Sequence, residues 1–124
     1  MNDINFTSFY LIKGRRYYAF YGCSKTKAKK VKFLENTPGF YHSMTKEASV
    51  VCCSLDGTSC SRKTVNGNCY FGTSKVSWKQ AFELCKDAKM RLCDSQEELD
   101  QCCGAECGLD DKLIWSNVLE GIAQ

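Results

Sequence analysis

Histidine is nearly absent from this sequence, because His42 is the only one in 124 residues. General acid–base catalysis near neutral pH most often uses histidine, and His42 does not belong to a recognisable pattern of nucleophile and acid. A cysteine nucleophile that met His42 through space would leave an odd thiol among the ten cysteines. We therefore expect a protein that is not an enzyme and has no cofactor.

Long apolar runs are also missing. No stretch approaches the ~18 apolar residues that a membrane helix requires, and no basic amphipathic helix stands out, so we expect no membrane insertion. The chain does not begin with the apolar core of a secretory leader either, since its least polar early stretch, Ile4–Ile12, is interrupted by Asn5, Thr7 and Ser8. We interpret it as a mature product or as a part of a larger chain or assembly.

Cysteine, by contrast, is abundant. Ten cysteines make up about 8% of the chain, a level typical of disulfide scaffolds. A small core buries too little apolar surface to fold alone, and reducing cytosol would keep its thiols open. We therefore predict a secreted, extracellular protein in which every cysteine forms a disulfide. The cysteines are Cys23, Cys52, Cys53, Cys60, Cys69, Cys85, Cys93, Cys102, Cys103 and Cys107. Their spacing does not say which of them pair.

Zinc is the competing explanation for clustered cysteines. Structural zinc sites use close Cys-x2-Cys or Cys-x4-Cys clips together with a second clip or with histidines. The sequence has no Cys-x2-Cys clip, and His42 lies outside the cluster. The vicinal pairs Cys52-Cys53 and Cys102-Cys103 also chelate poorly, because neighbours on a strand point to opposite faces. The same divergence suits two separate disulfides, so we predict no structural metal.

Composition changes near residue 48. Residues 1–48 contain nine Lys and Arg against three Asp and Glu, whereas residues 49–124 contain eight against eleven. We divide the chain into a basic, aromatic, β-rich segment (1–47), a disulfide-rich module (48–118) and a tail (119–124). In the first segment, Ile4–Ile12 and Arg16–Tyr21 are expected to form a hairpin, held by aromatic packing and a staple through Cys23.

The basic and aromatic residues of the first segment are candidates for ligand contact. Such residues hold anionic partners, while a β-rich cap with solvated lysines is the simpler interpretation. In an extracellular setting the partner would be a sulfated glycan or an acidic protein, and we expect no nucleic acid. The candidate ligand-binding residues are Arg15, Arg16, Tyr17, Tyr18, Lys29, Lys30 and Lys32. Asn5 begins an Asn-Phe-Thr sequon and is a candidate glycosylation site.

The second segment has clear local signals. Asp56-Gly57 and Asn66-Gly67 predict hairpin turns. Ser77, with Gln80 three residues later, predicts the start of a helix. Its apolar residues at helical spacing are Trp78, Ala81, Phe82, Cys85 and Ala88. A short strand at 91–93, a second helix from Ser95 to Cys102-Cys103 and a closing strand at 112–115 follow. The predicted fold is therefore α+β: a small disulfide-rich domain with two short helices on a few antiparallel strands.

Three stretches of this segment carry a family resemblance: Gly67–Phe71 (Gly-Asn-Cys-Tyr-Phe), Val76–Cys85 (Val-Ser-Trp-Lys-Gln-Ala-Phe-Glu-Leu-Cys) and Met90–Leu99 (Met-Arg-Leu-Cys-Asp-Ser-Gln-Glu-Glu-Leu). They resemble the opening half of C-type-lectin-like and Link domains. Cys93 departs from that pattern, and only 39 residues follow Cys85. The order of the cysteines also resembles small cysteine-rich repeats of uncertain function in large extracellular proteins. These resemblances imply extracellular recognition, carbohydrate binding included, and no catalytic residues.

Calcium is the one metal with a candidate site. Glu106, Asp110 and Asp111 cluster around glycines, and calcium favours oxygen-rich loops. No spaced Asp-x-Asp-x-Asp-Gly pattern accompanies them, and aspartates in turns usually bond their own backbone.

The sequence leads to one expected function. We expect non-enzymatic recognition, as a structural module for adhesion or matrix assembly that binds a protein or a glycan. The alternative is a secreted cysteine-rich effector, either a toxin or defence polypeptide or an enzyme inhibitor that would use the rigid loop Ser54–Ser61.

Overall fold

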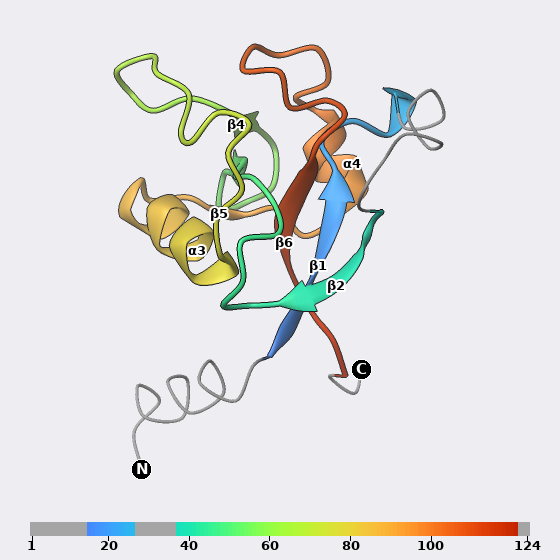
Figure 1. Cartoon of the computed structure of the whole chain (residues 1–124). Coiled ribbons are helices and arrows are strands. Elements are labelled where there is room, and N and C mark those ends of the chain that lie inside the picture. The colour runs from blue at the N-terminus through green and yellow to red at the C-terminus, as the bar shows by residue number, and fades with distance from the viewer. Residues whose placement is uncertain (1–14, 27–36, 122–124) are drawn as a thin grey trace.

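The computed structural model describes residues 15–26 and 37–121 (Figure 1). The elements in chain order are β1 (Arg16–Tyr21), the 3-10 helix η1 (Ser24–Thr26), β2 (Gly39–His42), β3 (Cys52–Cys53), β4 (Cys60–Ser61), α3 (Trp78–Asp87), β5 (Arg91–Leu92), α4 (Gln96–Asp100) and β6 (Leu113–Leu119). Two short α-helices, two small antiparallel sheets and five disulfides confirm the predicted disulfide-rich α+β fold.

The first sheet has the order β2-β1-β6, with β1 in the middle (Figure 1). Tyr17, Ala19 and Tyr21 alternate along β1 and point into the core, as the two-residue period of a strand requires. Both edges of β1 are paired, by β2 and by β6. The stretch Ile4–Ile12, expected to be the hairpin partner of β1, lies outside the described residues.

The second sheet has the order β4-β3-β5. Cys52 pairs with Ser61 in β4 and with Leu92 in β5, so β3 is again the central strand. The predicted turn at Asp56-Gly57 joins β3 to β4. Gly57 has φ 77° there, and a Cβ atom on it would lie 2.5 Å from Glu98 Oε2. The turn therefore needs glycine both for its backbone conformation and for its close approach to the Glu98 side chain.

Helix α3 begins as the sequence predicts. The Ser77 hydroxyl accepts the backbone N–H of Gln80, and the Gln80 side chain accepts the backbone N–H of Ser77, which completes a capping box. Trp78, Ala81 and Cys85 form its buried face. Phe82 and Ala88, which share the helical spacing of these residues, are exposed instead. Phe82 is 37% exposed, and its ring stacks on Trp78 at a centroid distance of 4.9 Å.

Helix α4 begins after Ser95, whose side chain accepts the backbone N–H of Glu98. It is shorter than predicted, since it ends at Asp100 and the chain then continues in turns through the vicinal cysteines. The closing strand β6 is longer than predicted and runs beside β1. Trp115 in β6 is fully buried and donates its indole N–H to the Val76 carbonyl at 2.7 Å.

Two buried clusters form the interior. One lies between the first sheet and α3 and contains Trp78, Trp115 and Leu92. The other lies around α4 and contains Leu99, Leu109 and Ile114. Strand β1 of the predicted first segment and β6 of the predicted module share one sheet, and Cys23 bonds Cys103 across the same division. The boundary near residue 48 stays a prediction, but these contacts join its two sides.

Helices long and apolar enough to cross a membrane do not occur in the described ranges 15–26 and 37–121.

Candidate functional site

All ten cysteines form disulfides, as predicted. The pairs are Cys23–Cys103, Cys52–Cys85, Cys53–Cys93, Cys60–Cys102 and Cys69–Cys107. The vicinal cysteines diverge as expected, because each member of a pair bonds a different segment. Within the described residues, the two clusters with the spacing of metal ligands each contain two sulfurs of one disulfide. Those sulfurs are not thiolates, so neither cluster has the donor set of a zinc site.

Three of the disulfides have one cysteine in the same short loop segment, residues 102–107. Cys102 bonds Cys60, Cys103 bonds Cys23, and Cys107 bonds Cys69. The segment is thereby fastened to three parts of the chain, 38 to 80 residues away in sequence. The other two disulfides join β3 to α3 and to the end of β5, and their four sulfur-bearing residues are fully buried.

A buried arginine lies beneath this segment. The Arg62 side chain is 1% exposed and forms an ion pair with Asp110, with Nη2 2.7 Å from Oδ1. It also donates to the carbonyl oxygens of Ala105, at 2.9 Å, and of Gly22, at 3.4 Å. Asp110 in turn accepts the backbone N–H of Gly104. We call these five residues the Arg62 network, and it joins three distant stretches of backbone around one cation.

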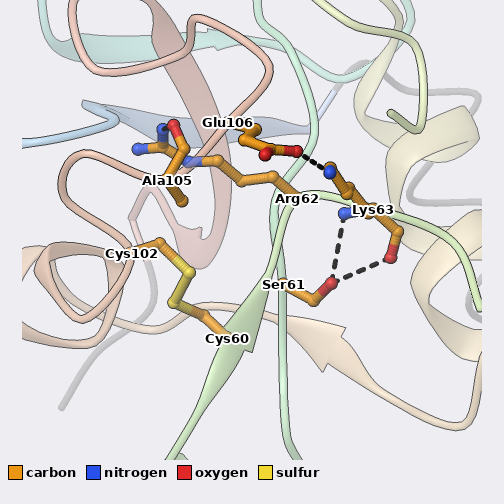
Figure 2. A pocket seen from close by; sticks show the side chains of 7 residues that line it. All are labelled: Cys60, Ser61, Arg62, Lys63, Cys102, Ala105 and Glu106. Atoms are coloured by element: carbon orange, nitrogen blue, oxygen red, sulfur yellow. Dashed lines mark hydrogen bonds and ion pairs between the residues drawn. A yellow bond between two sulfur atoms is a disulfide. The ribbon is translucent and has the colours of Figure 1, made fainter. Parts of the chain in front are cut away.

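A shallow hollow of about 280 Å³ opens beside the Arg62 network (Figure 2). The Cys60–Cys102 disulfide forms one side of the hollow, while Lys63 and Glu106 form an ion pair on the other (Figure 2). Its lining residues are Cys60, Ser61, Arg62, Lys63, Cys102, Ala105 and Glu106. Sequence reasoning missed this hollow, because its walls come from two segments about 40 residues apart.

The candidate calcium ligands lie beside the hollow but face cations. Glu106 pairs with Lys63 and Asp110 pairs with Arg62, while Asp111 is half-buried. Two of the three carboxylates are therefore already neutralised by neighbouring side chains, which leaves less negative charge for a calcium ion.

The candidate ligand-binding residues fall on both faces of the first sheet. Tyr17 points inward and stacks on Trp78, with the ring centroids 3.8 Å apart and the planes inclined by 5°, and burial raises the pKa of its hydroxyl. Tyr18 points outward and contacts Phe20 and Phe40. Lys29, Lys30, Lys32 and the glycosylation candidate Asn5 lie outside the described residues.

A second set of aromatic side chains lies on the side of β1 and β2 opposite to Tyr17, Ala19 and Tyr21, where Phe20 packs against the buried cluster around α4. We call this side the aromatic face; its members are Arg16, Tyr18, Phe20, Phe40 and His42. Tyr18 lies 4.7 Å from Phe20 and 5.0 Å from Phe40, measured between ring centroids. The Arg16 side chain donates a hydrogen bond to the Phe40 carbonyl at 2.9 Å and forms an ion pair with Glu120 at 3.5 Å. Sequence reasoning missed Phe40, which only the pairing of β2 with β1 brings beside Tyr18.

The loop Ser54–Ser61, which the inhibitor alternative would use, is fixed by several hydrogen bonds. The Asp56 carboxylate accepts bonds from the Ser54 and Thr58 hydroxyls and from the Thr58 backbone N–H. Leu55 is 68% exposed, but its carbonyl accepts the Arg91 side chain at 3.1 Å. The loop therefore presents an apolar side chain while its backbone carbonyl is bound within the molecule.

The hydrogen bonds of this loop predict its response to acid. The Thr58 hydroxyl and N–H, with the Ser54 hydroxyl, lower the pKa of Asp56 from 3.8 to about 2. A depressed carboxyl pKa stabilises the folded loop above pH ~3.8, and that contribution is lost as the pH falls through ~2. An NMR titration of the Asp56 carboxyl should give a midpoint near 2, and Thr58→Val should raise it. A midpoint near 3.8 in the unmodified chain would contradict these contacts.

Comparison of the chain with protein-family models, with curated proteins and with solved structures finds no match. The resemblance to C-type-lectin-like and Link domains accordingly stays a hypothesis.

Proposed function

We propose that this protein is a non-enzymatic recognition module of the extracellular space, which contributes to adhesion or matrix assembly by binding an anionic glycan at the aromatic face. The observation that carries the proposal is the juxtaposition of three half-buried aromatic rings with the Arg16 guanidinium on one side of the first sheet. Aromatic rings pack against the apolar faces of sugar rings, and a guanidinium binds sulfate or carboxylate groups in a two-pronged geometry.

The rigidity of the face supports the same function. Tyr18 pairs with Phe40 of β2. On its other side the register with β6 shifts, and there Ser116 donates its hydroxyl to the Tyr18 carbonyl at 2.7 Å. A surface that is already ordered loses little conformational entropy when it binds. Five disulfides in 124 residues support the extracellular setting.

Charge favours a glycan with acidic groups over a neutral one. Arg15, just before β1, and Arg16, its first residue, precede Tyr18 in the chain, and residues 1–48 carry a net charge of +6. Arg16 is half-exposed and its partner Glu120 is 40% exposed at the side chain, so solvent screens this ion pair. A sulfate or carboxylate on the ligand can therefore replace Glu120 at small energetic cost.

A glycan array, run with and without calcium, tests this proposal. We expect binding to sulfated or carboxylated glycans that persists in chelator and weakens with salt. Tyr18→Ala should weaken it by about tenfold, since a central aromatic contact contributes more than 1 kcal/mol and 1.4 kcal/mol corresponds to tenfold.

Phe82→Ala is the control, because Phe82 is an exposed aromatic ring on α3, outside the aromatic face. It should bind like the unmodified chain. Equal loss in both variants, or no glycan binding at all, would overturn the proposal. Dye release from anionic vesicles would instead favour the effector alternative.

A further inference from the structure

The five disulfides differ in what surrounds them. Cys52–Cys85 and Cys53–Cys93 are fully buried, and the Glu98 carboxylate lies within 4.8 Å of the Cys53 and Cys93 sulfurs. Disulfides are opened by attack of an anionic thiolate on a sulfur atom. Burial denies that attacker access, and a neighbouring carboxylate repels it. Burial therefore protects both of these inner disulfides, and the Glu98 carboxylate adds to the protection of Cys53–Cys93.

The other three disulfides, which we call the outer disulfides, are protected unequally from attack by a thiolate. They are Cys23–Cys103, Cys60–Cys102 and Cys69–Cys107. The Asp100 carboxylate lies 3.7 Å from Cys103 Sγ, and the Arg62 carbonyl oxygen lies 3.5 Å from Cys107 Sγ. The Asp100 carboxylate is negatively charged and the Arg62 carbonyl oxygen carries a partial negative charge, so each disfavours a thiolate beside that sulfur. Cys69, the partner of Cys107, is half-buried like Cys60. Cys60–Cys102 instead lines the open hollow, whose lining includes the side chains of Arg62 and Lys63 (Figure 2).

We infer that the hollow is a thiol-exchange site, at which a thiol-bearing molecule opens Cys60–Cys102 in preference to the other four disulfides. The hollow gives an attacker room. Of its two cations, Arg62 is buried and paired with Asp110, whereas Lys63 is 37% exposed at the side chain and pairs with Glu106. Lys63 is therefore the cation that an approaching thiolate would meet. This site lies apart from the aromatic face and does not depend on the glycan proposal. Its ligand class is a small anionic thiol or a cysteine of another chain, which would become covalently attached.

The direction of the exchange follows from burial. Cys60 is half-buried, whereas Cys102 is 6% exposed, so the attacker reaches Cys60 Sγ. The lone pair of the thiolate forms a bond to Cys60 Sγ, and the electron pair of the Cys60–Cys102 bond passes to Cys102 Sγ. Cys102 leaves as a thiolate that takes a proton from water. The incoming thiol is oxidised to a mixed disulfide on Cys60, and Cys102 is reduced.

Glutathione is a suitable probe. The folded chain would be incubated with reduced glutathione, quenched with an alkylating agent at intervals, and mapped by peptide mass spectrometry. We expect glutathione on Cys60 and the alkylating group on Cys102 before any other cysteine reacts. First reaction at Cys103, Cys107 or an inner cysteine, or simultaneous loss of all five disulfides, would overturn the inference.

Charge variants test the role of the hollow itself. Lys63→Gln should slow the exchange by about threefold and Glu106→Gln should accelerate it by a similar factor, because the two side chains form a partly exposed ion pair of modest strength. Lys86→Gln is the control, since Lys86 is exposed on α3 and does not line the hollow. Equal rates in all four proteins would show that charge in the hollow does not direct the attack and would overturn this part of the inference.

Discussion

Arg62→Met should lower the free energy of unfolding by about 3 kcal/mol. Methionine fills the space of the aliphatic stem but removes every donor of the guanidinium. The carbonyls of Gly22 and Ala105 and the carboxylate of Asp110 then lose their partner. Removing one member of a buried ion pair typically costs about 3–5 kcal/mol, and the lower end applies because the Asp110 side chain is 31% exposed.

Denaturant unfolding under non-reducing conditions measures this effect. Lys63→Met is the matched control, since its ammonium pairs with the 74% exposed Glu106 and should change stability by less than ~1 kcal/mol. The double variant R62M/D110N should recover part of the loss, because it removes the unpaired carboxylate as well. A loss below ~1 kcal/mol for Arg62→Met would show that the Arg62 network does not hold the 102–107 segment.

Removing the Cys52–Cys85 disulfide should lower the free energy of unfolding more than removing the Cys60–Cys102 disulfide. The entropy of loop closure alone predicts nearly equal losses of stability for the two. The two disulfides close loops of similar length, with separations of 33 and 42 residues, for which chain entropy predicts about 4 kcal/mol each. Cys52 and Cys85 are also fully buried in the cluster around Trp115. Replacing both by alanine leaves unfilled volume there, which adds about 1–2 kcal/mol.

The comparison of C52A/C85A with C60A/C102A therefore separates packing from loop closure. Both variants would be unfolded in denaturant with the remaining four disulfides oxidised. Equal midpoints would mean that the buried sulfurs contribute little beyond the closed loop. A larger loss for C60A/C102A would contradict the assignment of the core to the inner disulfides.

The local elements were predictable because their signals lie within a few residues. The capping box of Ser77 and Gln80 and the cap at Ser95 specify helix starts through side-chain bonds to the nearest backbone N–H groups. Asp56-Gly57 specifies a turn through a backbone conformation that glycine adopts easily. Helix ends were less predictable: α4 ends at Asp100, earlier than its sequence indicates, where the chain turns toward the outer disulfides.

The candidate sites were predictable only in part. Arg16 and Tyr18 were expected to contact a ligand, and they lie on the aromatic face. Tyr17 was placed with them, yet it packs inward on Trp78, because neighbours on a strand alternate between faces. The basic and aromatic composition pointed to β1 as a candidate contact segment. It did not tell which of its residues face the core and which lie on the other face of the sheet.

The sequence by itself determined that the ten cysteines form disulfides and that the vicinal cysteines bond separate partners. A cysteine count and the alternation of strand side chains are sufficient for both conclusions. Only the tertiary structure decided which cysteines pair, and that Arg62, a charged residue beside the partly exposed Lys63, lies in the interior. Its burial depends on Asp110 and on the carbonyls of Gly22 and Ala105. These groups are 40 to 48 residues away along the chain, so no local pattern encodes their meeting.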